Sequence, residues 1–164
     1  MLWRNYRFVS GFLFLASVIG MAFALYLEHF QGLEPCPLCV FQRVGLIGLG
    51  LFSLIAFLHN PKHQMMKRIY AALGSIAILW SAGVAIRHVW LQNLPADQVP
   101  SCGPGLDYLI EALPLKTVFQ QVLSGSGECA VVDWAFLGQS LPVWSALFFS
   151  ILALISLWQL FRRY

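Results

Sequence analysis

Four long apolar stretches constrain the fold of this chain more than any other feature of its sequence. Each has about 20 residues, the length that an α-helix needs to cross roughly 30 Å of hydrocarbon. Lipid offers no hydrogen-bond partners, so a spanning segment of this kind satisfies its backbone groups as a helix. The sequence therefore predicts an all-α, polytopic membrane protein with a four-helix transmembrane bundle, its helices at about 8–27, 40–58, 69–89 and 141–160.

The composition excludes an ordinary soluble domain. Of the 164 residues, 59% are hydrophobic and 10% are charged, whereas about 25% of the residues in a typical soluble domain are charged. We expect a single membrane domain over residues 1–164, with outer loops at about 28–39 and 91–140.

Charged residues predict how the chain is oriented in the membrane. Seven of the ten basic residues precede the first span, lie between the second and third, or follow the fourth. By the positive-inside rule this side is cytoplasmic, and so are both termini. All seven acidic residues and all four cysteines fall in or beside the two outer loops, which face the oxidising compartment. The seven basic residues are Arg4, Arg7, Lys62, Lys67, Arg68, Arg162 and Arg163.

The first apolar stretch has a second interpretation, as a cleavable signal peptide. Arg4 and Arg7, the apolar run and Ala-Phe-Ala at 22–24, with its two small residues, all fit that pattern. However, the run continues to Leu27, beyond the roughly 7 to 15 residues of a signal core. Cleavage would also leave an odd number of helices and place the C-terminal charges on the wrong side. A spanning helix is the better interpretation.

The long outer loop contains two sets of apolar residues at i, i+3, i+4 and i+7, the spacing of one helix face. Turn-forming Pro and Gly flank both sets, and neither is long enough to span. We therefore predict two short amphipathic helices, which lie flat in the membrane interface or pack on the ends of the bundle. The sets are Leu106, Leu109, Ile110 and Leu113, then Leu115, Val118, Phe119 and Val122.

A C-x-x-C motif lies where the first span has ended and the second is beginning. Cys36 and Cys39 lie in Glu-Pro-Cys-Pro-Leu-Cys at 34–39, and Pro37 suits a first helical turn. The start of a helix stabilises a nearby thiolate through its N–H groups and its dipole, which favours a reactive, reversible disulfide. A thiol pair at the membrane surface can meet soluble proteins on one side and a lipid-soluble electron carrier on the other. The motif thus predicts an electron-passing membrane protein.

Arg43 follows Cys39 by four residues, on the same face of the predicted helix. Its guanidinium is always charged, so it can stabilise a Cys39 thiolate and donate hydrogen bonds to a carbonyl oxygen of the carrier. The alternative is an interfacial arginine that reaches for water.

The other two cysteines, Cys102 and Cys129, lie in the long outer loop beside Gly and Pro residues. A zinc site is one alternative, but Cys102 and Cys129 do not repeat the short C-x-x-C spacing that is usual for zinc. A second alternative is a pair of structural disulfides, which small secreted domains use to compensate for a missing core. Accessible cysteines in flexible loops instead suit repeated exchange with each other and with partners.

The sequence resembles the bacterial disulfide bond formation protein B (DsbB) family over nearly its whole length. The resemblance rests on Pro-Cys-Pro-Leu-Cys-Val-Phe-Gln-Arg at 35–43 and Gly-Glu-Cys-Ala at 127–130. It also rests on Trp-Ala-Phe-Leu-Gly at 134–138, followed by Pro-Val-Trp at 142–144. C-x-x-C alone is a weak signal. Its combination with Arg43, the four spans and the Cys-Ala-x-x-x-Trp-x-Phe-Leu-Gly run at 129–138 is specific.

The resemblance implies a disulfide-generating protein-dithiol:quinone oxidoreductase of the bacterial inner membrane, with periplasmic cysteines. Its partners are a periplasmic DsbA-like thiol oxidase, membrane lipid and quinone, either ubiquinone or menaquinone, with no metal and no nucleic acid. The resemblance also implies that Cys102 takes the mixed disulfide with the DsbA-like partner, and that the Cys102–Cys129 pair then passes electrons to Cys36 and Cys39. The helix start alone favours Cys36 as the more acidic thiol, whereas Arg43 favours Cys39 as the thiol that faces the quinone.

His88 is a weaker candidate for the quinone site. It lies beside Arg87 near the outer end of the third span and can hydrogen-bond a quinone or transfer a proton. An interfacial histidine with no special role is the alternative. Trp90, Trp134 and Trp144 are most simply anchors in an interfacial aromatic belt.

Two other functions compete with this one. A vitamin K epoxide reductase type of enzyme is also a four-helix, quinone-linked thiol protein, but we expect its C-x-x-C on the last helices. A binding protein with static disulfides would resist mild reductants, whereas exchanging disulfides are reduced easily.

Overall fold

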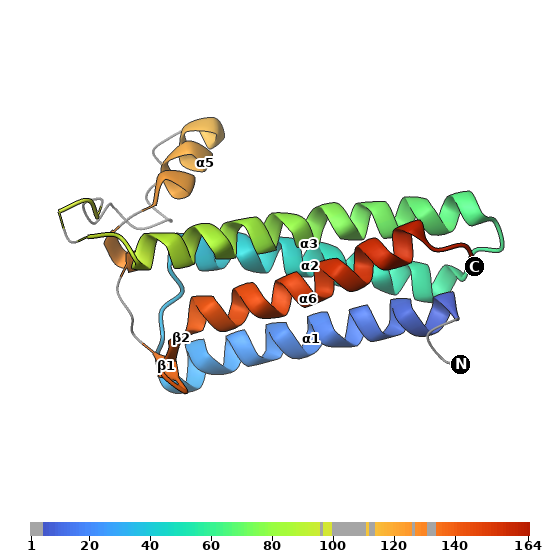
Figure 1. The fold of residues 1–164 in the computed structure, drawn as a ribbon, viewed down its shortest axis with the longest axis horizontal. Helices are drawn as coiled ribbons and strands as arrows, with labels where there is room; N and C mark the ends of the chain where they lie inside the picture. Colours follow the sequence, from blue (N-terminus) through green and yellow to red (C-terminus); the bar gives the residue numbers. More distant parts are fainter. Residues whose placement is uncertain (1–4, 96, 100–110, 112–113, 126, 131–133) are drawn as a thin grey trace.

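The structure is a computed structural model that describes residues 5–95, 97–99, 111, 114–125, 127–130 and 134–164. In this part of the chain four helices are long and apolar enough to cross a membrane. They lie side by side in a bundle (Figure 1), with α2 between α1 and α3, and α6 against α3. The predicted four-helix membrane fold is therefore confirmed. The helices are α1 (Tyr6–Gln31), α2 (Pro37–His59), α3 (Gln64–Gln92) and α6 (Leu141–Phe161).

Local signals set the helix ends that matter for the site. The α1 helix ends at Gly32, whose φ of 66° is the left-handed conformation that glycine adopts easily. Cys36 then occupies the N-cap position of α2, and Pro37 is the first residue of the helix, where a missing N–H costs nothing. The short connection between the two helices thus delivers the C-x-x-C to the end of the bundle.

The bundle core is apolar and is joined by a few buried hydroxyl and amide contacts. One cluster of buried side chains includes Leu13, Leu49, Ile78 and Leu152, one from each long helix. Outward-facing side chains such as Leu154 are large, apolar and exposed, as expected for surfaces that face lipid. Three buried polar contacts join different helices in this core: Ser75 with Ser156 at 2.8 Å, Gln159 to Ser10 at 2.8 Å, and Ser81 to the Gln42 backbone carbonyl at 2.7 Å.

One end of the bundle carries the smaller elements that the described residues form, and α1 begins and α6 ends at the other (Figure 1). The smaller elements are the helix α5 (Leu115–Ser124), the 3₁₀ turn η2 (Gly127–Ala130), and the strands β1 (Ala135–Phe136) and β2 (Gln139–Ser140). The Cys36 end of α2 lies among them. The described residues of the sequence motifs therefore lie together at this end of the bundle.

The helix α5 is the second of the two predicted amphipathic helices. Its Val118 and Val122 are buried in a cluster with Leu38 of α2 and Val84 and Leu91 of α3. The burial of these two side chains agrees with the predicted alternative in which the helix packs on the end of the bundle. Phe119 is 46% exposed and touches the rings of Phe41 and Trp80. The other predicted amphipathic helix, at 106–113, lies outside the described residues apart from Glu111.

The segment 134–138, which entered the sequence argument only through a family resemblance, forms a hairpin that leads into α6. Ala135 pairs with Ser140 and Phe136 with Gln139. Leu137 and Gly138 form the two-residue turn with φ values of 52° and 77°, the pattern of a type I′ turn. The indole N–H of Trp144 donates to the Phe136 carbonyl at 3.1 Å, which ties the hairpin to the first turns of α6.

Candidate redox site

The two cysteines of the C-x-x-C lie in contact at the start of α2. Their sulfurs are 3.1 Å apart, and both residues are half-buried. A disulfide bond is about 2.05 Å long, so only a small movement of either side chain is needed for a bond to form when an acceptor takes up two electrons and two protons. The motif therefore has the geometry of a reversible thiol pair.

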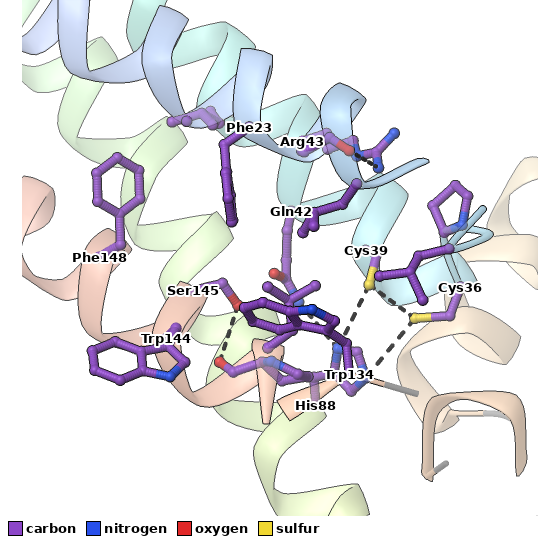
Figure 2. A pocket seen from close by; sticks show the side chains of 18 of the residues that line it. Phe23, Cys36, Cys39, Gln42, Arg43, His88, Trp134, Trp144, Ser145 and Phe148 are labelled. Carbon is purple, nitrogen blue, oxygen red and sulfur yellow. Dashed lines mark hydrogen bonds between the residues drawn. The ribbon is translucent and has the colours of Figure 1, made fainter. Parts of the chain in front are cut away.

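His88 of α3 lies against both sulfurs. Its Nε2 is 3.9 Å from the Cys36 sulfur and its Nδ1 is 3.9 Å from the Cys39 sulfur. Figure 2 shows the imidazole facing the thiol pair. The ring is buried, with 4% of the residue exposed. The structure thus brings His88 to the thiols from a helix that the sequence alone could not place beside them.

The hydrogen bonds of His88 identify which ring nitrogen carries the proton. Nε2 lies 3.0 Å from the backbone carbonyl of Cys129, and a carbonyl only accepts, so Nε2 carries the hydrogen. Nδ1 then accepts from the side-chain amide of Gln42 at 3.4 Å. The nitrogen that faces Cys39 is therefore a proton acceptor, and the nitrogen that faces Cys36 is a donor.

Gln42 is a site residue that the sequence argument did not single out. It is buried on α2, three residues after Cys39, and its backbone carbonyl accepts from the Ser81 hydroxyl. Two signals could have found it: a polar side chain inside a predicted span marks a candidate functional site, and the i+3 spacing places it near the face of Cys39.

Cys129 lies in the 3₁₀ turn η2, next to the thiol pair. Its sulfur, the Cys36 sulfur and a ring nitrogen of His88 all lie within 4.8 Å of one another. The expectation that Cys129 is accessible is wrong, because the residue is only 1% exposed. Burial arises because α5 and η2 fold back onto α2 and α3 and enclose Cys129 with Leu38 and Leu91. Cys102 lies outside the described residues.

In the structure the Arg43 side chain contacts α1, which the sequence did not predict. Its guanidinium forms an ion pair with Glu28 near the end of α1, and its Nη2 donates to the Ala24 carbonyl at 3.5 Å. The Arg43 side chain is 21% exposed, so it does not simply extend into water. Sequence spacing could not reveal this pair, since it depends on how α1 packs against α2.

A cavity of about 370 Å³ opens beside the thiols. This volume lies within the range of about 300–1,000 Å³ that is usual for small-molecule sites. Figure 2 shows Cys36 and Cys39 at one end of the cavity and the rings of Trp144 and Phe148 at the other. Arg43, Gln42 and His88 also line it, and most of the remaining lining side chains are apolar ones from α1 and α6. The cavity therefore suits a largely apolar molecule with polar groups at the thiol end.

Comparison with known proteins identifies the family. The family model described as "Disulfide bond formation protein DsbB" matches residues 6–159. The chain belongs to the DsbB family. Proteins named "Disulfide bond formation protein B" from Acinetobacter baylyi and Acinetobacter baumannii are each 71% identical over 160 residues, covering 98% of this chain and 94% of the relative. The protein of that name from a Psychrobacter species is 57% identical over 160 residues, covering 96% and 93%.

Membership in the DsbB family implies a disulfide-forming oxidoreductase, and the four apolar helices imply a multi-pass membrane protein. It also removes the main reason to consider a vitamin K epoxide reductase type of enzyme. The motif at 134–138 contributes to the site, because Trp134 lines the cavity that adjoins the thiols. Trp144 lines the same cavity, a placement beyond the anchoring role expected for both tryptophans.

Cys36, His88 and Cys129 also have ligand atoms close enough to hold a metal ion such as zinc. However, the Nε2 hydrogen of His88 is donated to the Cys129 carbonyl, and coordination through Nε2 would break that bond. Coordination would also block the sulfurs from exchange. A metal-free site stays a prediction.

Proposed function

We propose that this DsbB-family protein is a thiol:quinone oxidoreductase of the bacterial inner membrane. It oxidises a periplasmic DsbA-like dithiol protein and passes the electrons to ubiquinone or menaquinone. The observation that carries the proposal is the meeting of Cys36, Cys39 and Arg43 at one end of a largely apolar cavity. Both termini then lie in the cytoplasm, and the cavity end of the bundle faces the periplasm.

The residues around the cavity fit a quinone. Arg43 supplies a charged donor for a ring carbonyl, and the aromatic and aliphatic side chains of α1 and α6 suit a ring with an apolar tail. A bound quinone takes up two electrons and two protons and leaves as quinol. The role of Glu28 is to hold the Arg43 guanidinium in its orientation through their ion pair.

Disulfide exchange connects the outer thiols to this cavity. A thiolate of the DsbA-like partner attacks Cys102 in a Cys102–Cys129 disulfide, which releases Cys129 as a thiolate. Cys129 lies next to Cys36, so it attacks that sulfur of a Cys36–Cys39 disulfide. A Cys36–Cys129 disulfide forms, and Cys39 leaves as a thiolate on the cavity wall.

Two further exchanges complete the cycle. The second partner thiolate displaces Cys102, which releases the oxidised partner, and the Cys102 thiolate then attacks Cys129. This restores the Cys102–Cys129 disulfide and leaves Cys36 and Cys39 as a dithiol. The dithiol gives two electrons and two protons to the quinone and becomes a disulfide again, so one partner disulfide is made for each quinol.

His88 manages protons between these steps. Its Nδ1 is an acceptor 3.9 Å from Cys39, so it can take the thiol proton when Cys39 becomes the electron donor. Its Nε2 hydrogen faces Cys36 and the Cys129 carbonyl, which favours negative charge on the leaving Cys36 sulfur. Gln42 keeps this tautomer by donating to Nδ1.

Two half-reactions test the proposal separately. A DsbA-like protein that lacks its second active-site cysteine should accumulate a covalent complex with this protein, and Cys102→Ser should abolish the complex. A short-chain quinone added to the reduced protein without a partner should yield quinol in the wild type and none in Cys39→Ser. A complex that survives Cys102→Ser, or quinol formation that survives Cys39→Ser, would contradict the assignment.

A further inference from the structure

We propose that Arg87 is a positioning residue that holds Cys129 against Cys36. The inference rests on the proposed function, in which Cys129 exchanges between Cys102 and Cys36. Sequence reasoning gave Arg87 no role beyond its place next to His88. Arg87 is not one of the residues that line the cavity, and its side chain donates to α5.

Arg87 binds the end of the helix that precedes Cys129. Its Nε donates to the carbonyl of Leu123 at 3.2 Å, and its Nη2 donates to the carbonyl of Ser124 at 3.1 Å. These are the last two residues of α5. The final carbonyls of a helix have no partners within the helix and form the negative end of its dipole. A cation there is favourable both as a hydrogen-bond donor and as a charge.

Trp90 fixes the direction of the Arg87 guanidinium. The guanidinium lies over the Trp90 ring, 4.1 Å from its centroid. Both residues belong to α3 and are separated by three positions, the spacing at which side chains on one helix meet. Because one face of the planar group is covered by the ring, its edge is presented to the two α5 carbonyls. Arg87 therefore acts as a preorganised clamp.

Two further contacts from α3 continue the line from the end of α5 to Cys129. Leu91 packs against Gly125, where a Cβ would come within 2.5 Å of a Leu91 methyl carbon. Gly125 has a φ of 89°, so its conformation and its packing both favour glycine. His88 then donates to the Cys129 carbonyl. Arg87, Leu91 and His88 thus fix three points between residue 123 and residue 129.

This arrangement sets how often the Cys129 sulfur meets Cys36. A cysteine that must exchange between two partners needs a docked position that is stable but reversible. Arg87 supplies part of that stability through contacts at the protein surface, away from the reacting atoms. Loss of its two charge-assisted hydrogen bonds should lower the effective concentration of Cys129 at Cys36 by about tenfold.

The test isolates the docking step from the partner and from the quinone. In a protein carrying Cys39→Ser and Cys102→Ser, only Cys36 and Cys129 remain as cysteines. Equilibration in glutathione buffers gives the equilibrium constant for forming the Cys36–Cys129 disulfide. In this reaction one oxidised glutathione and the protein dithiol give the protein disulfide and two glutathione thiols. The fraction oxidised is read by thiol alkylation and gel shift. Failure of this test leaves the quinone half-reaction untouched.

Arg87→Ala in this background should lower the equilibrium constant about tenfold, and Arg87→Lys should give an intermediate value because it keeps the charge but loses the planar fork. Arg162→Ala is the matched control. Its guanidinium also lies over a tryptophan, 4.4 Å from the Trp158 ring centroid, but at the other end of the bundle. An unchanged constant in both Arg87 variants, or an equal decrease in Arg162→Ala, would overturn the proposal.

Discussion

Arg43→Ala should separate quinone use from thiol exchange. The substitution removes the charged donor from the cavity wall and leaves Glu28 without its ion-pair partner. A hydrogen bond to a charged group typically contributes about 1.5–3 kcal/mol, which corresponds to a rise of roughly 10-fold to 150-fold in the apparent quinone KM. Arg43→Lys should restore only part of this, since lysine lacks the planar fork.

The effect on stability should be much smaller than the effect on quinone binding. Both side chains of the pair are partly exposed, at 21% for Arg43 and 29% for Glu28. Exposed ion pairs typically contribute about 0–1 kcal/mol. The double variant Arg43→Ala, Glu28→Ala removes the unpaired carboxylate as well. It should therefore unfold like the wild type while keeping the raised quinone KM.

The assay follows quinone absorbance at saturating reduced partner over a range of quinone concentrations. A single-turnover measurement of partner oxidation, which depends on Cys102 and Cys129, serves as the internal control and should be nearly normal. An unchanged quinone KM in Arg43→Ala with a collapse of partner exchange would refute the reasoning. Arg43 would then be structural or partner-facing, and the quinone site would have to lie elsewhere.

Three further predictions follow from other parts of the structure. His88→Gln should slow quinol formation by the reduced protein by about 100-fold, the lower end of general-base effects, and a normal rate in stopped-flow measurements would remove His88 from proton transfer. Gly45→Ala should lower the free energy of unfolding by about 1–3 kcal/mol, because its Cβ would come within 2.5 Å of a backbone carbonyl of α3. The added Cβ of Gly83→Ala meets no atom within 4 Å, so this control should unfold at or above the thermal midpoint of the wild type. Equal thermal midpoints for the two variants would argue against close α2–α3 packing. A membrane-impermeant thiol reagent should label reduced Cys102 from the periplasmic side and an introduced Lys62→Cys from the cytoplasmic side only, and the reverse pattern would invert the proposed orientation.

Local rules account for the parts of the fold that could be predicted. Hydropathy over about 20 residues located the spans, Pro37 and the thiol spacing located the start of α2, and the repeat of Val118 and Val122 located α5. Each of these signals depends on neighbouring residues in one segment. The structure therefore agrees with them closely, and the long helices extend only a few residues beyond most of the predicted spans.

Contacts between segments account for what the sequence left open. Cys129 has glycines nearby, which suggested exposure, but the packing of α5 on α2 and α3 buries it. Gln42 and His88 lie 46 positions apart and meet only because α2 and α3 pack together. The same holds for Glu28 with Arg43 and for Arg87 with the end of α5. None of these pairs has a sequence signature, since their geometry depends on helix packing.

The most direct test of the central claim is coupled turnover by the purified protein in lipid. Reduced DsbA-like protein and a membrane quinone are mixed with catalytic amounts of the wild type, and partner disulfide and quinol are measured together. We predict one quinol for each disulfide, with no turnover when either substrate is omitted and none in Cys39→Ser. Disulfide formation that continues without quinone, or quinone reduction uncoupled from the partner, would contradict the account.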